Sequence, residues 1–361
     1  MKRRAFLQKL GTAAAAAAAV SYPGKSTHAA VRIRWRMVMS WPLHFPILGE
    51  SMDRLAADVA SMSKGRFTIK VFGGGELVPP LGVFDAVSAG TVQMGNGAAY
   101  YWSGKAPAAA FFTNVPFGMN AQQTNAWLDP GGGLDLWREL YAPHRLVPFA
   151  VGNSGVQMGG WFRKPLEGVG DIRGLKMRMP GLGGKVFSRA GGTVVLLPAS
   201  EILPALERGV IDATEWVGPY LDARLGLYQA AKHYYYPGWQ EPSAIVEMTV
   251  SAKAWKSLPR DYQAIVETAA GNVNGWALAE FDARNAQALK TLADKHGIKP
   301  KRFPDDMLKA FRKNSEEVLD EMTSKDPKAR KIYNHYKNFQ DTARTWARIG
   351  EEAVSYAKSL G

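Results

Sequence analysis

Three polar side chains interrupt otherwise apolar, strand-like segments in the middle of the chain. Gln157 lies in VQMGGWF, Arg178 in LKMRMPG and Glu215 in IDATEWV. Burying a polar or charged group costs free energy unless a partner or a ligand compensates it. The three groups are of complementary type, and each stands at the end of a short strand-like run. We therefore expect them to meet around a small anionic ligand, with a structural ion pair as the alternative for any one of them.

Strand-like and helix-like segments alternate along the first third of the chain. Strand patterns cover residues 32–40, 67–72 and 91–97, and helical patterns cover residues 46–63 and 81–89. This alternation indicates an α/β sheet that binds ligands at its strand ends. The roughly 330 residues that follow an N-terminal signal favour two lobes around a cleft over one core.

The rest of the chain predicts a second lobe and a return to the first. Further strands are expected near 146–150, 156–163, 175–179, 193–197, 211–216 and 244–251, with helices near 125–140, 183–190 and 200–208 and a turn over 234–241. We assign lobe I to residues 30–151 and 242–300 and lobe II to residues 152–241. Two crossings imply a hinge on which the lobes can close.

Long helical patterns dominate the C-terminal part of the chain. Residues 260–296 form one such pattern, a short strand is expected at 298–303, and residues 301–361 otherwise read as C-terminal helices. Their last apolar stripe consists of Ile332, Tyr336, Phe339, Ala343 and Trp346. It predicts packing across the lobes or against a second copy in a homodimer.

The N-terminus carries the features of an export signal. MKRRAFLQK precedes an alanine-rich apolar run that is about half the ~20 residues a membrane helix needs. Arg3 and Arg4 followed by Phe6 and Leu7 indicate a twin-arginine signal, which exports folded proteins. An ordinary secretory signal with a chance arginine pair is the alternative. We predict that residues 1–29 are the signal and that the protein is periplasmic.

Composition narrows the partners. The chain has no cysteine, so a large core must replace disulfides in an oxidising compartment. Five basic residues and no acid precede residue 30, and removing them from the formal charge of +13 leaves +8. Export and the scattered lysines argue against nucleic acid as a partner. A positive field that attracts small organic anions is the better interpretation.

Five runs of sequence resemble a known family. DIRGLKMR (171–178) and SEILPALERGVIDATEW (200–216) resemble the solute-binding subunits of TRAP transporters, of the DctP type. VQMGGWFRK (156–164), ATEWVGPY (213–220) and YYYPGW (234–239) are similar to its 2-oxo acid-binding branch. The resemblance covers essentially the whole chain after the signal. It implies a two-lobed α/β periplasmic binding protein, type II-like, that passes a small 2-oxo or 2-hydroxy acid to TRAP membrane subunits.

The resemblance also implies roles for individual residues. Arg178 matches the arginine that holds the ligand carboxylate, a task that suits the rigid guanidinium fork. A salt bridge between Arg178 and a buried acid such as Glu215 is the alternative. The loop that carries Tyr100 and Tyr101 is expected beside the ligand, and Asn153 is expected to donate to its oxo or hydroxyl oxygen. The predicted substrate-binding residues are Arg178, Asn153, Gln157, Trp216, Tyr100 and Tyr101.

A bridging metal ion resolves a conflict of charge in this set. Glu215 would repel a carboxylate ligand, and a cation between the two removes the repulsion. The resemblance implies sodium or calcium held by oxygen atoms. The predicted metal ligands are Gln157, Glu215, the Trp216 carbonyl and Glu241, with Glu247 competing for the position of Glu241.

Motifs for catalysis are weak. Thiol chemistry is excluded, and the five histidines after residue 29 lack the i, i+4 spacing of a metal pair. We expect a binding protein and not an enzyme. An exported enzyme acting on a carboxylic acid is one alternative, and a binding protein that feeds a signalling receptor is another.

The export prediction is tested by replacing both arginines. Because the twin-arginine route reads the paired arginines, Arg3→Lys together with Arg4→Lys should block export. Cell fractionation measures how much protein reaches the periplasm. Delivery of the double variant at the normal rate would contradict the twin-arginine assignment.

Overall fold

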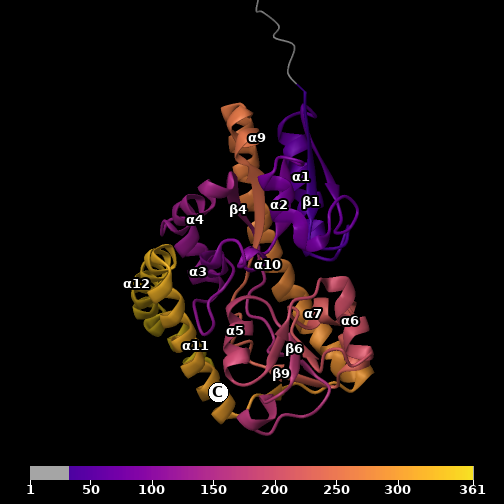
Figure 1. Ribbon diagram of the computed structural model, residues 1–361, viewed down its shortest axis with the longest axis vertical. Coiled ribbons are helices and arrows are strands. Elements are labelled where there is room, and N and C mark those ends of the chain that lie inside the picture. The colour runs from indigo at the N-terminus through magenta and orange to yellow at the C-terminus, as the bar shows by residue number, and fades with distance from the viewer. Residues whose placement is uncertain (1–31, 361) are drawn as a thin grey trace, which may run out of the picture. The chain divides into compact units, whose positions relative to one another are not determined.

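The computed structural model describes residues 32–360 and is shown in Figure 1. The predicted signal, residues 1–29, lies outside the described residues. Within 32–360, no helix combines the length and apolar character that a bilayer crossing requires. The mixed sheets and many helices confirm the predicted α/β class.

The first sheet has the strand order β2-β1-β3-β10-β4. β1 runs parallel to β3, whereas β10 runs antiparallel to both β3 and β4. The helical and strand patterns predicted before residue 98 are confirmed, with β2 at the predicted bounds. The strands are β1 (Ile33–Met39), β2 (Phe67–Phe72), β3 (Met94–Gly97), β4 (Leu146–Asn153) and β10 (Ile245–Ser251).

The second sheet has the strand order β11-β9-β5-β8-β6-β7. All four strands predicted between residues 156 and 216 are present, each shorter than its pattern. The strands are β5 (Gly160–Phe162), β6 (Lys176–Arg178), β7 (Thr193–Val195), β8 (Ala213–Thr214), β9 (His233–Tyr236) and β11 (Lys301–Arg302).

β9 corrects one prediction. Residues 234–241 were expected to form a turn, yet the first of them continue a strand that pairs with β5. The indole of Trp161 stacks on the ring of Tyr234, with the ring centres 3.9 Å apart. Adjacent buried aromatics therefore favour pairing, and the chain turns only after Tyr236.

Helices surround both sheets. α10 packs against β4 of the first sheet and against α7, which follows β8 of the second sheet. The α-helices are α1 (Leu48–Met62), α2 (Val83–Ser88), α3 (Ala121–Leu128), α4 (Gly133–Tyr141), α5 (Gly181–Arg189), α6 (Ala199–Glu207), α7 (Pro219–Arg224), α8 (Leu227–Ala230), α9 (Ala252–Ser257), α10 (Arg260–His296), α11 (Asp305–Lys325), α12 (Pro327–Ile349) and α13 (Glu351–Lys358). The 3₁₀ helices are η1 (Pro80–Gly82), η2 (Ala99–Trp102), η3 (Pro107–Phe112), η4 (Ala142–His144) and η5 (Val169–Ile172).

The chain passes between the two sheets more often than the sequence predicted. The connections from β4 to β5 and from β9 to β10 are the two expected crossings. A third follows α10, because β11 pairs with β9 in the second sheet. α11 then packs on α5, and α12 packs on α3, α4 and η3.

The apolar stripe of α12 is buried at one end and exposed at the other. Tyr336 is buried, its ring packs edge-on against Trp127, and its hydroxyl accepts a 2.8 Å hydrogen bond from the Met119 amide. Trp346, at the other end of the stripe, is 63% exposed. The first part of the stripe therefore packs on the protein's own helices, and only its end is left uncovered.

β10 carries Glu247 into the core of the first sheet. The Trp102 indole donates to its Oε1 at 2.7 Å, and the Tyr141 hydroxyl donates to its Oε2 at 2.6 Å. Burial raises the pKa of Glu247 to about 7, although both hydrogen bonds act in the opposite direction. Both carboxylate oxygens are committed to these donors, so Glu247 is not available as the metal ligand that competes with Glu241.

The raised pKa of Glu247 predicts a pH-dependent contribution to stability. The folded chain holds a proton that the unfolded chain releases near 4.5, so stability falls as pH rises from about 4.5 to about 7. Above that range ionisation costs about 3 kcal/mol. In Glu247→Gln this loss should be absent, because the amide oxygen still accepts from Trp102 and its NH₂ can donate to the Tyr141 hydroxyl.

Urea unfolding at about pH 5 and about pH 8 measures the effect. The stability difference between wild type and variant should change by about 2 kcal/mol, since all other groups titrate alike in both proteins. Parallel pH profiles would show that Glu247 has an ordinary pKa.

Candidate functional site

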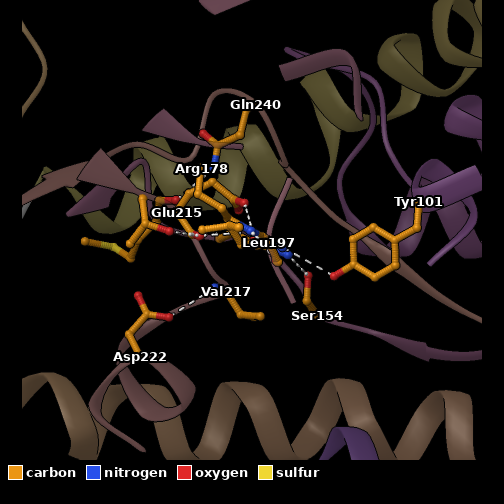
Figure 2. A network of polar contacts seen from close by, with 11 residues as sticks. Tyr101, Ser154, Arg178, Leu197, Glu215, Val217, Asp222 and Gln240 are labelled. Carbon is orange, nitrogen blue, oxygen red and sulfur yellow. Dashed lines mark hydrogen bonds and ion pairs between the residues drawn. The ribbon is translucent and has the colours of Figure 1, made fainter. Parts of the chain in front are cut away.

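Arg178 and Glu215 stand side by side because of the strand register. β6 and β8 are parallel neighbours in which Arg178 lies opposite Thr214, so Glu215 emerges at the same sheet edge. The carboxyl ends of parallel strands are the usual ligand-binding edge of an α/β sheet. Arg178 is 1% exposed and Glu215 is fully buried. The two form an ion pair through Arg178 Nη1 and Glu215 Oε1 (Figure 2).

The guanidinium of Arg178 is held on three sides. Its Nε donates to the Leu197 carbonyl at 3.2 Å, and its Nη1 donates to the Glu215 carbonyl at 3.1 Å. Its Nη2 makes one long bond, 3.4 Å, to the Tyr101 hydroxyl. One N–H of Nη2 thus has no bond, which leaves this end of the fork free to hold an anion. The alternative salt bridge with Glu215 is present, and it leaves that end unused.

Several buried oxygen atoms among the described residues have no hydrogen-bond partner, and three of them bear on the predicted metal site. They are Gln157 Oε1, Glu215 Oε2 and Glu241 Oε2. A buried acceptor without a donor is costly, and such an atom in a native fold indicates an absent ion, water or ligand. All three belong to the predicted metal set.

The backbone and the charges tie these residues together. The Gln157 amide donates to the Glu241 carbonyl at 3.1 Å. Burial, followed by the charge of Glu215, raises the pKa of Glu241 well above its usual range. Burial also raises the pKa of Glu215, while Arg178 opposes the rise. Two carboxylates that repel each other in a dry site are stabilised by a cation, which lowers both pKa values.

The residues fit a hard cation with oxygen ligands. Within residues 32–360, no cluster of three or more His, Cys, Asp and Glu side chains is placed to hold a metal. Two carboxylates and an amide oxygen are instead the donors that calcium and sodium prefer.

A small cavity of about 30 Å³ is lined by Tyr101 and Trp216, which both contact Arg178. It is lined from both sheets and their connections, by Trp41, Tyr100, Tyr101, Ser154, Gln157, Trp216 and their neighbours. The structure therefore brings both predicted tyrosines, Gln157 and Trp216 to one place. The Trp216 ring faces Arg178, whose guanidinium carbon lies 5.1 Å from the ring centre.

The side chain of Asn153 forms its hydrogen bonds outside this cavity, and its predicted contact with the ligand stays a prediction. Its amide nitrogen donates to Asn125 Oδ1 at 3.1 Å, and its own oxygen accepts from the Gly155 amide at 3.0 Å. It does not line the cavity. Asn153 instead links the connection that leaves β4 to α3, because it bonds Gly155 in that connection and Asn125 in the helix.

Sequence reasoning missed residues that support the site. Trp41 follows β1 and lines the cavity. Its position just after a predicted strand could have identified it as a ligand-site residue, because ligands bind at strand ends. Asp222 is buried and accepts from the Val217 amide at 3.0 Å (Figure 2). It also accepts from the Trp161 indole at 2.9 Å. It thereby holds the segment that contains Glu215 and Trp216. No local pattern distinguishes Asp222 from a solvated helix residue.

Comparison with known proteins bears on this geometry. A family model described as bacterial extracellular solute-binding protein, family 7, matches residues 37–326. A monocarboxylate 2-oxoacid-binding periplasmic protein of Nostoc sp. (strain PCC 7120) is 45% identical over 356 residues, which cover 97% of each chain.

Solved structures agree with the fold throughout. One is a TRAP transporter solute-binding protein of Bordetella bronchiseptica RB50, a mixed-occupancy dimer with copurified calcium and picolinate in one active site. It is 42% identical to this chain with a TM-score of 0.89, and the match covers 91% of this chain and 98% of that one. A TRAP periplasmic solute-binding protein of Pseudoalteromonas atlantica T6c with bound sodium and pyruvate is 40% identical with a TM-score of 0.88, covering 90% and 99%.

These findings confirm the resemblance that the sequence predicted. The match extends over both sheets and the long helices α10 and α11, and it ends before α12. The chain belongs to the bacterial extracellular solute-binding proteins of family 7, among the solute-binding subunits of TRAP transporters.

Proposed function

We propose that this protein is the periplasmic solute-binding subunit of a TRAP-type secondary transporter. It captures a small 2-oxo or 2-hydroxy monocarboxylate, of the size of pyruvate or lactate, and delivers it to the membrane subunits. The observation that carries the proposal is the free N–H of Arg178 together with the buried, unbonded oxygen atoms of Gln157, Glu215 and Glu241. The names and ligands of the relatives support the same chemistry.

The residues divide the work between a cation and an anion. Gln157, Glu215 and Glu241 would hold calcium or sodium through their unbonded oxygens, with the Trp216 carbonyl as a further ligand. When bound, the cation supplies positive charge that lets a carboxylate lie beside Glu215 and that also attracts the oxygen on carbon 2.

Arg178 would hold the second carboxylate oxygen through its free N–H. Acetate and propionate lack the oxygen on carbon 2 and would leave a coordination position empty. This is the physical basis for preferring 2-oxo and 2-hydroxy acids.

Binding is proposed to occur by closure of lobe I, residues 30–151 and 242–300, on lobe II, residues 152–241. The Tyr101 hydroxyl bonds Arg178, although the two residues come from opposite lobes. Gly181, with φ of +63°, lies so close to Tyr100 that an added Cβ would be 3.1 Å from the tyrosine Cβ. These contacts support closure of the two lobes over the site.

Two alternatives predict different outcomes. An exported enzyme would convert its acid, so prolonged incubation followed by NMR would reveal a product. A binding protein that feeds a signalling receptor would bind the acid as tightly, yet its deletion would leave uptake intact. The family itself consists of solute-binding proteins, which favours transport.

The bridging arrangement predicts that Arg178→Met and Glu215→Gln fail for different reasons. Each should weaken pyruvate binding roughly a hundredfold, because each removes one partner of a buried charge contact. Only Arg178→Met should retain metal, since the oxygen ligands remain. Calorimetry with pyruvate and elemental analysis of the purified proteins measure the two effects.

Glu247→Gln is the matched control, because it also removes a buried carboxylate but leaves the site untouched. It should keep both metal and affinity. Undiminished pyruvate affinity in exhaustively chelated wild-type protein would rule out the bridging cation and leave Arg178 as the only anion anchor.

We also propose that the C-terminal helices form a homodimer. Besides Trp346, the apolar residues Ile349, Val354, Tyr356 and Leu360 on or after α12 are each more than half exposed. A run of exposed large apolar side chains is typical of an interface. The Bordetella bronchiseptica relative is a dimer.

The dimer predicts a mass of two chains in light scattering at micromolar concentration. Trp346→Glu with Ile349→Glu should produce monomers with unchanged pyruvate affinity, because these residues lie on the surface of α12, outside the ligand cavity. A wild-type protein that is monomeric under these conditions would remove the proposal.

A further inference from the structure

A second and much larger cavity lies next to the ligand cavity. Its volume is about 740 Å³, and it is bounded by the loop after η2, the start of α5 and the C-terminal part of α11. Tyr100 and Tyr101 line both cavities. The two tyrosines therefore form the wall that separates the small ligand cavity from the large one.

The two tyrosines are held differently. Tyr100 is 8% exposed, its amide donates to Thr113 Oγ1 at 3.1 Å, and its ring lies against Gly181. Tyr101 is less buried and points its hydroxyl at Arg178 (Figure 2). Its ring makes an edge contact with the ring of Tyr100 and a tilted contact with that of Trp41, with 4.9 and 6.0 Å between ring centres. Tyr101 is thus the part of the wall that faces the ligand's position directly.

The large cavity suits an uncharged chain. Apolar side chains line much of it, namely Met179, Val194, Leu196, Val318 and Met322. Two of the three basic residues that line it form ion pairs, Arg189 with Glu317 and Glu321, and Lys325 with Glu321, and the third is Lys185. An aliphatic tail that entered would be buried against apolar surface.

We propose that Tyr101 determines the length of acid that the protein accepts. Its ring closes the end of the ligand cavity and denies the acid's tail access to the larger cavity beyond. This inference rests on the proposed function, since it assumes that the carboxylate and the oxygen on carbon 2 are held beside Arg178.

Calorimetry with a series of straight-chain 2-oxo acids tests the role of Tyr101. Pyruvate, 2-oxobutyrate, 2-oxopentanoate and 2-oxohexanoate are titrated, in excess calcium, into wild type and Tyr101→Ala. Wild type should bind 2-oxohexanoate at least about tenfold more weakly than pyruvate, since extra methylenes do not fit a closed cavity. Tyr101→Ala should shift this ratio toward the longer acid by about tenfold or more, because the tail then reaches apolar surface.

Tyr101→Phe is the matched control. It keeps the ring and removes only the hydroxyl that bonds Arg178. It should weaken all four acids by a similar factor and keep the length preference of wild type. A shift toward long acids in Tyr101→Phe would assign the preference to the hydroxyl and overturn the proposal.

A second variant and a second ligand guard against simpler explanations. Leucine fills more of the wall than alanine, so Tyr101→Leu should shift the ratio of affinities by an intermediate amount. This variant keeps the test valid if Tyr101→Ala does not fold. With 2-oxoglutarate, Tyr101→Ala should gain less than with 2-oxopentanoate. A larger gain would contradict the apolar character of the tail site.

The outcomes separate this inference from the proposed function. If wild type binds none of the 2-oxo acids, the proposed function fails. If wild type binds pyruvate while Tyr101→Ala keeps the wild-type order of affinities, only the role of Tyr101 is refuted. Equal affinity of wild type for pyruvate and 2-oxohexanoate would refute it as well.

Discussion

The buried ion pair of Arg178 and Glu215 is the interaction on which the rest of the site depends. Two charges removed from water are tolerated only when their remaining bonding capacity is satisfied. Arg178 bonds two backbone carbonyls and Tyr101 and keeps one N–H free, whereas Glu215 keeps one oxygen unbonded. The pair therefore offers a donor to an anion and an acceptor to a cation. In the proposed function a cation binds the free oxygen, and this links binding of the acid to binding of the metal.

The fold places this pair where two sheets can reach it. Parallel pairing of β6 with β8 brings Arg178 and Glu215 to one edge, and the segment after β9 adds Glu241. Residues that follow strands β1 and β3 in the first sheet, Trp41 and Tyr101, close over the other side. Aromatic rings form much of this cover, and they exclude water without adding charge. Electrostatic interactions are stronger in such a dry site than in water.

Buried carboxylates divide into separate roles according to their donors. Glu247 and Asp222 each receive hydrogen bonds on both oxygens, from Trp102 and Tyr141 in one case and from Val217, Trp161 and Tyr234 in the other. They hold the fold together around the site. Glu215 and Glu241 each keep an oxygen free and remain able to bind a cation. The supply of donors, and not burial, separates structural from functional acids here.

The sequence by itself determined the elements and the chemical character of the site. Residues 67–72 and 260–296 form a strand and a helix at the predicted bounds, because their apolar spacing and flanking residues are local properties. Arg178, Gln157 and Glu215 were identifiable because polar groups in apolar strands need a compensating partner.

Only the tertiary structure decided which side chains share a space. Glu241 and Glu247 are both acidic residues close together in the sequence, yet strand pairing sends Glu247 to Trp102 and Tyr141 and leaves Glu241 beside Glu215. Asn153 forms a hydrogen bond with the distant residue Asn125. Residues 233–236 form a strand because they pair with β5, which is also distant in sequence. The physical reason is that long-range pairing and register select a side chain's neighbours, and no local pattern carries that information.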